Sequence, residues 1–176
     1  MAKHLVEATP AALAGSIVDL QTQLRLERFL AYEAALMDDH QYQQWHALWA
    51  DGDIRYWVPC NDDDQDPMTG IAIIYDDRAS LDERMMRLKD KNAHAYRPQP
   101  KLVRTISGVV PLSREDDELV VASSFVLGEM RAGLQNIWFG KCLYRLQDDP
   151  ERFRIRSKKV MLLNNDEAMP NLTFLV

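Results

Sequence analysis

The sequence has 176 residues, 47% of them hydrophobic and 27% charged, which predicts one globular domain with an ordinary core. The net charge of −6 argues against nucleic acid as a partner, and no apolar stretch approaches the roughly 20 residues that span a bilayer. We expect an N-terminal arm over residues 1–18 and a single domain over residues 19–176. Cys60 and Cys142 lie far apart in strand-like segments, which favours a reducing cytoplasm over a disulfide framework.

Helices are predicted in the first half of the domain. Apolar residues recur at spacings of three and four from Leu20 until residues 38–40 end the pattern, as on one face of an α-helix. A shorter helix is predicted over residues 41–50. A third is predicted over residues 81–89, with Ser80 as its N-cap. Two short strands, residues 54–59 and 71–75, separate the second helix from the third.

The second half is predicted to consist of β-strands. Hydrophobic alternation and turn residues predict four long strands, over residues 101–112, 118–130, 134–146 and 153–163. Their connections are short, which predicts antiparallel neighbours. The order of helices and strands predicts an α+β fold, in which a curved antiparallel sheet carries the N-terminal helices on one face. A strongly bent sheet wrapped round a long helix makes a cone. The interior of the cone either holds a ligand or is filled by side chains.

Metal ligands are not grouped in this sequence. A Rieske cluster requires cysteines and histidines in paired short spacings, and no histidine lies near Cys60 or Cys142. His40 and His46 are six residues apart, which does not place them on one helical face. We therefore expect no metal and no other cofactor in this chain.

The acidic loop over residues 61–70 raises the possibility of a calcium site. An EF-hand loop that starts at Asp62 needs glycine at its sixth position and glutamate at its twelfth, where Pro67 and Ile73 stand. A solvated loop is the expectation.

Glu33 is the most informative single residue, because it lies on the apolar stripe of the first helix. A carboxylate there needs a partner. One interpretation is a general base that faces the cone interior, assisted by His40 or a tyrosine. The favoured interpretation is a buried structural pair with Arg104 on the first long strand.

Several motifs, taken in order, resemble one known family. They are the segments 29–39, 53–59, 76–81, 104–107, 139–140, 158–160 and 171–175, together with Trp45. Their order and spacing resemble the small (beta) subunit of aromatic-ring-hydroxylating dioxygenases, over roughly Leu26 to Val176. Gly108 departs from the pattern, because the family often has asparagine there.

The resemblance implies the cone-shaped fold of cystatin-like and nuclear-transport-factor-like proteins. It implies a structural subunit without catalytic residues, which supports a large (alpha) subunit, usually as three copies of each. The large subunit would hold a Rieske [2Fe-2S] cluster and a mononuclear non-haem iron, and NADH would supply electrons through a separate reductase. The product would be a cis-dihydrodiol. The acidic loop and the segment 73–75 after it favour a benzoate-type aromatic acid as substrate.

Partner contacts and two alternative functions complete these expectations. Candidate interface residues are Tyr56, Trp57, Asp77, Arg78, Arg84 and Arg87, and copies of the chain are expected to meet round a threefold axis.

The alternative functions are a stand-alone dehydratase or isomerase that uses Glu33, His40 and tyrosines, and a module that binds a small ligand. A polar cavity in the cone would favour the enzyme, whereas bulky apolar filling would favour a scaffold.

Overall fold

The computed structural model describes residues 17–61, 69–89 and 98–176. Most of the predicted N-terminal arm, and most of the acidic loop with its calcium hypothesis, therefore lie outside the described residues. Among the helices within these ranges, none combines the length and apolarity needed to cross a membrane.

Within the described residues, three helices precede or interrupt the strands. Helix α3 spans Leu20–Asp38 and is capped by the Asp19 side chain, which accepts a hydrogen bond from the Thr22 amide at 2.6 Å. Helix α4, Tyr42–His46, is shorter than predicted, because the chain after it pairs with the last strand through the Ala50 amide and the Ile155 carbonyl.

Helix α5 corrects the predicted N-cap. It spans Arg78–Lys89 and so begins three residues before the predicted start. The Asp77 carboxylate, rather than Ser80, is the cap, and it accepts a hydrogen bond from the Ser80 amide at 2.9 Å. Hydrogen bonds from the Ser80 backbone and side chain lower the pKa of Asp77, as expected for a carboxylate at a helix N-terminus.

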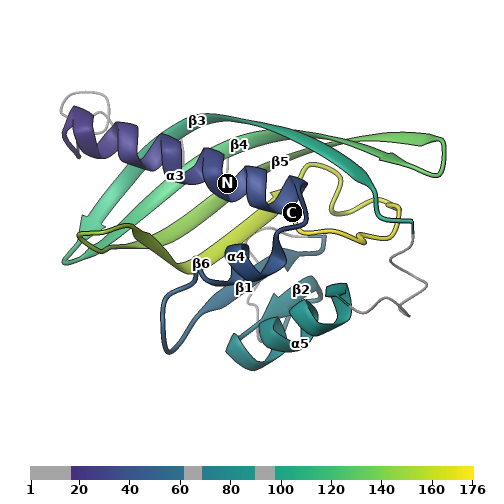
Figure 1. Cartoon of the computed structure of the whole chain (residues 1–176), viewed down its shortest axis with the longest axis horizontal. Coiled ribbons are helices and arrows are strands. Elements are labelled where there is room, and N and C mark those ends of the chain that lie inside the picture. Colours follow the sequence, from purple (N-terminus) through teal and green to yellow (C-terminus); the bar gives the residue numbers. More distant parts are fainter. Residues whose placement is uncertain (1–16, 62–68, 90–97) are drawn as a thin grey trace.

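Six strands form one curved sheet in the order β2-β1-β6-β5-β4-β3 (Figure 1). Their bounds are Arg55–Pro59 for β1, Ala72–Asp76 for β2, Lys101–Glu115 for β3, Glu118–Arg131 for β4, Leu134–Asp148 for β5 and Phe153–Leu162 for β6. Strands β3 to β6 are antiparallel neighbours, as their short turns predict. The expectation of a wholly antiparallel sheet is wrong, because β1 pairs with β6 in parallel. Turn lengths report only on strands consecutive in sequence, so they could not reveal this pairing.

Helix α3 protects the free edge of β3. The Gln23 amide group donates to the Val109 carbonyl at 2.9 Å, and the Asp38 carboxylate accepts from the Arg104 amide at 2.8 Å. A ring nitrogen of His40 lies 2.9 Å from the Pro100 carbonyl. Unpaired backbone N–H and C=O groups at a sheet edge can pair with another chain and promote aggregation. These three contacts occupy some of those groups and so protect part of the edge.

Bulky side chains fill the interior of the cone. Trp45, Tyr56, Tyr144 and Phe153 are fully buried, and the ring of Trp45 packs edge-on against Trp49 and Tyr56. The Phe125 ring lies so close to Gly140 that a Cβ atom at residue 140 would stand 2.5 Å from it. Bulky apolar filling of this kind leaves little room for a substrate and favours a scaffold over an enzyme.

Candidate functional site

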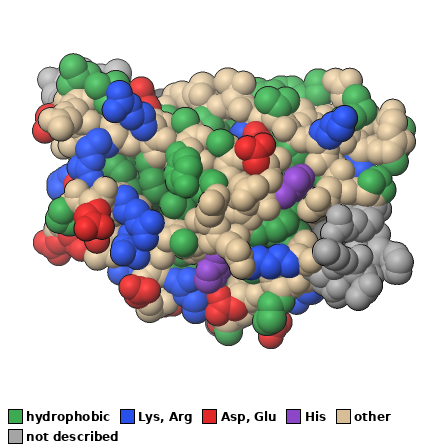
Figure 2. All heavy atoms as spheres, in the orientation of Figure 1, with side chains coloured by type: hydrophobic (Ala, Val, Ile, Leu, Met, Phe, Trp, Pro, Cys, Tyr) green, Lys and Arg blue, Asp and Glu red, His purple; other side chains and the backbone are tan. Residues whose placement is uncertain are grey.

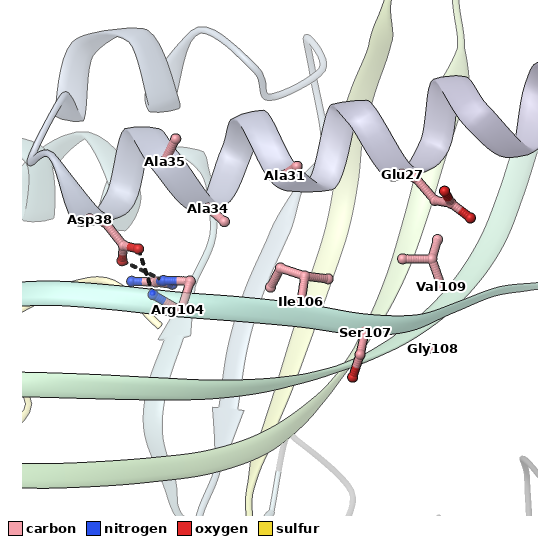
Figure 3. Close-up of a pocket in the computed structure, with 10 residues that line it drawn as sticks. All are labelled: Glu27, Ala31, Ala34, Ala35, Asp38, Arg104, Ile106, Ser107, Gly108 and Val109. Atoms are coloured by element: carbon pink, nitrogen blue, oxygen red, sulfur yellow. Dashed lines mark hydrogen bonds and ion pairs between the residues drawn. The ribbon is translucent and has the colours of Figure 1, made fainter.

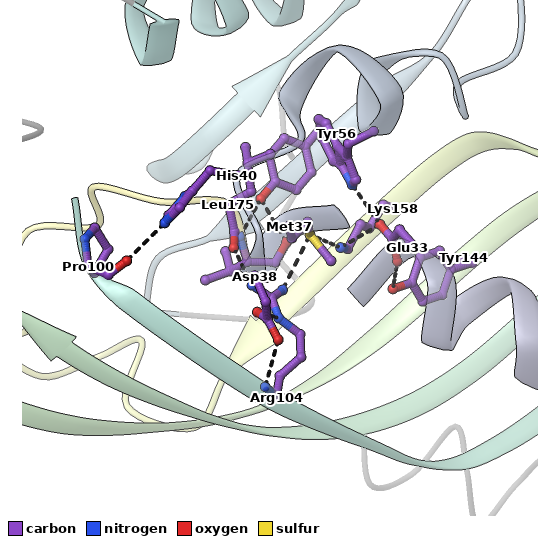
Figure 4. A network of polar contacts seen from close by, with 12 residues as sticks. Glu33, Met37, Asp38, His40, Tyr56, Pro100, Arg104, Tyr144, Lys158 and Leu175 are labelled. Atoms are coloured by element: carbon purple, nitrogen blue, oxygen red, sulfur yellow. Dashed lines mark hydrogen bonds and ion pairs between the residues drawn. The ribbon is translucent and has the colours of Figure 1, made fainter. Parts of the chain in front are cut away.

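The polar centre of the cone is the Glu33 carboxylate. Glu33 lies on the buried side of α3, between Leu30 and Met37, and is 1% exposed. Lys158 of β6 donates to Oε1 at 2.8 Å, and Trp45 of α4 donates to the same oxygen at 3.1 Å. Tyr144 of β5 donates to Oε2 at 2.8 Å (Figure 4). Both carboxylate oxygens are therefore occupied by donors from the chain itself.

The predicted cation for Glu33 is wrong: Lys158, also 1% exposed, takes the place expected for Arg104. Arg104 of β3 pairs instead with Asp38, which lies further along α3, with 2.7 Å between Nε and Oδ1. The sequence placed Glu33 inward correctly but could not rank two cations on different strands. Strict alternation from Phe153 and Ile155 would turn Lys158 outward. The register irregularity where β6 pairs with Arg145 and Leu146 changes the phase, so that Lys158 shares the inward side with Val160 and Leu162.

Arg104 also holds the segment 173–176 inside the cone. Its guanidinium donates to the Leu175 carbonyl at 2.9 Å. The Tyr56 hydroxyl donates to the Val176 carbonyl at 2.8 Å and accepts from the Val176 amide at 3.1 Å. All four residues of the segment are buried, and Phe174 packs edge-on against Trp138. This segment occupies interior space that a ligand would otherwise need.

His40 does not join Glu33. One of its ring nitrogens lies 2.8 Å from the Tyr42 hydroxyl, and the other faces the Pro100 carbonyl. The acid–base pair on which the stand-alone enzyme depends is therefore not brought together. Among the described residues, no three His, Cys, Asp or Glu side chains group as a metal site.

A surface groove of about 380 Å³ lies between α3 and β3 (Figure 3). Ala31, Ala34 and Ala35 form its helical wall, and the Asp38–Arg104 pair closes one end. On this face of the molecule, acidic and basic side chains are interspersed among hydrophobic ones (Figure 2). The groove is separate from the filled interior. The charges of Asp38 and Arg104 at its end already neutralise each other.

Some of the predicted interface residues are buried or bonded within this chain. Tyr56 is 0% exposed, so its assignment to the surface of this chain is wrong; an inward strand position places it in the core. Arg78 donates to the Ala50 carbonyl, and Arg84 donates to Asp76 at 3.1 Å.

The other three candidates lie at the surface, and Arg78 and Arg84 keep partial exposure. Asp77 caps α5, and Arg87 is exposed beside Glu83 at 3.5 Å. Trp57 is half-buried on the outward side of β1, with the Lys159 ammonium 4.2 Å from its ring centre.

Alkaline pH tests the buried hydroxyls of this site. Burial raises the pKa of Tyr56 and Tyr144 above the ordinary value of tyrosine. The unfolded chain ionises its tyrosines at about pH 10, so their stabilising contribution is complete below that pH and is lost as pH rises above it. We expect the melting temperature to fall steeply from about pH 10 upward. Tyr144→Phe should reduce the steepness, whereas Tyr32→Phe, an exposed control, should not.

Fold and site together define a class: an α+β cone whose interior is closed by its own side chains. The same fold occurs in an NTF2-like protein with a cystatin-like fold from Novosphingobium aromaticivorans, with a TM-score of 0.58 at 14% identity over 82% of this chain and 84% of that chain. The predicted fold is confirmed.

Residues 32–166 match the family described as ring hydroxylating beta subunit, and the chain therefore belongs to the beta subunits of aromatic-ring-hydroxylating dioxygenases. The small oxygenase component of the p-cumate 2,3-dioxygenase system of Pseudomonas putida is 32% identical over 143 residues, 80% of this chain and 79% of that protein. The benzoate 1,2-dioxygenase beta subunit of Burkholderia mallei superimposes with a TM-score of 0.72 at 24% identity, covering 90% and 98% of the two chains. A beta subunit of a multicomponent oxidoreductase associates with an alpha subunit.

Proposed function

We propose that this chain is the structural small subunit that supports the iron-bearing large subunit in the cis-dihydroxylation of an aromatic acid. The observation that carries the proposal is the closed centre of the cone. Glu33 accepts three hydrogen bonds from the chain, and the segment 173–176 is held beside this centre. An interior used in this way stabilises the subunit and leaves the reaction to its partner.

The redox centres belong to the large subunit in this proposal. That subunit holds the Rieske [2Fe-2S] cluster and the mononuclear non-haem iron, and a separate reductase passes electrons from NADH. Three large and three small subunits assemble in the cytoplasm, with the small subunits in contact round a threefold axis. Membership of the family supports this arrangement.

A benzoate-type substrate is the finer part of the proposal. Several relatives are named for such acids: p-cumate, 2-halobenzoate, anthranilate, benzoate and toluate. They are 29–32% identical to this chain, and another relative is named for benzene at 24% identity. The gradient in identity supports an aromatic acid over an unsubstituted hydrocarbon.

Co-expression with the large subunit of the same organism tests the function. We expect a complex many times heavier than the 20.3 kDa chain, measured by light scattering. The complex should convert benzoate to a cis-dihydrodiol when reductase and NADH are added, and the chain alone should show no turnover. A chain that stays monomeric beside the large subunit, or that dehydrates or isomerises a small molecule alone, would contradict the proposal.

A further inference from the structure

The outward side of the sheet carries an apolar surface that the core does not use. We call it the outer apolar surface and define it by Val103, Val126, Ile137, Phe139 and Leu163. All five side chains are exposed, and none belongs to the core cluster. Their inward neighbours in sequence, such as Leu127 and Trp138, are buried in that cluster, as strand alternation requires.

Strand pairing makes this surface continuous. Val126 stands directly opposite Phe139, and Gly128 stands between Val103 and Ile137 on its two neighbouring strands. Leu163 joins through its amide, which donates to the Phe139 carbonyl at 2.9 Å. The uncovered face of an antiparallel sheet is normally polar, so a row of valine, isoleucine, phenylalanine and leucine indicates that another molecule covers it.

The outer apolar surface also contains a concave depression. Val126, Phe139 and Leu163 line a hollow of about 390 Å³. Met161 lines the same hollow and is buried, although it is not part of the core cluster. A side chain of a partner would find an apolar depression there, which is the usual setting for an interface anchor.

The charges on the strands around this surface have one sign. Lys101 stands opposite Met130, and Lys141 stands opposite Ser124, both on the outward side. Neither lysine forms an ion pair with any residue that the structure describes. The outward carboxylates of β3 and β4, Glu115 and Glu118, lie at the far turn and are paired with Arg145. A chain of net charge −6 thus presents lysines beside the outer apolar surface.

We infer that the outer apolar surface is the docking face for the large subunit, which meets it with an apolar patch bordered by carboxylates. The inference rests on the proposed function. A second copy placed face to face about a twofold axis would bring Lys101 and Lys141 of each chain against the same lysines of the other, which like-charge repulsion opposes. Contact between copies round a threefold axis is head to tail, so it does not set this surface against itself. The large subunit is free to present the opposite charge. The main contact then lies on the sheet and not on α5, where the sequence predicted it.

The test inserts a carboxylate at matched exposed positions. Ile137→Glu changes the outer apolar surface, and Met86→Glu changes α5; the two side chains are 56% and 65% exposed. Each variant is co-expressed with a tagged large subunit, and the ratio of small to large chain is measured in the purified complex. We expect Ile137→Glu to lower this ratio about tenfold or more, because it buries an unpaired charge, and Met86→Glu to leave it unchanged. Lys141→Glu should also lower the ratio, since it reverses the rim charge.

Thermal melts of the isolated variants show that loss of binding is not loss of folding. Normal assembly of Ile137→Glu overturns the inference, as does loss of assembly by Met86→Glu alone, which moves the contact to α5. If Ile137→Glu abolishes self-association of the isolated chain yet binds the large subunit normally, a second copy covers this face and the inference is wrong. Failure of the unmodified chain to bind the large subunit would instead overturn the proposed function.

Discussion

Replacing Lys158 by methionine is expected to lower the free energy of unfolding by about 3–5 kcal/mol. The ammonium lies 2.8 Å from Glu33 Oε1, and both side chains are 1% exposed. Its removal leaves a buried carboxylate with two neutral donors, Trp45 and Tyr144, and no cation. Chemical denaturation of the isolated chain, followed by tryptophan fluorescence, measures the change.

The double variant Glu33→Gln with Lys158→Met isolates the charge effect. Because replacing both members of a buried pair by neutral groups is often close to neutral, we expect it to recover most of the lost stability. Lys141→Met, which removes a lysine on the outward side of β5, should change the free energy of unfolding by less than about 0.5 kcal/mol. A Lys158→Met chain as stable as the unmodified protein would show that the ion pair contributes nothing net.

Arg104→Met is the second substitution with a large expected effect, about 3 kcal/mol of lost stability. The guanidinium neutralises Asp38, which stands at the C-terminal end of α3, where the helix dipole disfavours a negative charge. It also satisfies the buried Leu175 carbonyl. We therefore expect faster hydrogen exchange of the amides in the segment 173–176 as well as a lower melting temperature.

Arg114→Met is the matched control for Arg104→Met. Arg114 pairs with Asp148 at 2.6 Å, but its side chain is 41% exposed, so its loss should cost no more than about 1 kcal/mol. Equal effects of the two substitutions would mean that burial of Arg104 adds nothing. Unchanged exchange in the segment 173–176 would mean that apolar contacts alone hold it.

The elements were largely predictable from sequence because their signals are local. The period of the apolar residues placed α3 and the four long strands within a few residues of their observed bounds. The errors were local as well. Both Ser80 and Asp77 are good capping residues, and the structure selects Asp77. The second helix ends early because its C-terminal flank pairs with β6, which local propensity does not report.

By itself the sequence determined the class of protein: the order of motifs identified the beta-subunit family, and the apolar stripe of α3 turned Glu33 inward. The tertiary structure alone decided which cation meets Glu33. The register irregularity between β5 and β6 turns the Lys158 side chain inward, and the parallel pairing of β6 with β1 sets it opposite the fully buried Tyr56. The outer apolar surface has the same origin, since its members come from separate strands and become neighbours only through the register of the sheet. Partner choice and surface continuity depend on contacts between residues far apart in the chain, and periodicity carries no information about them.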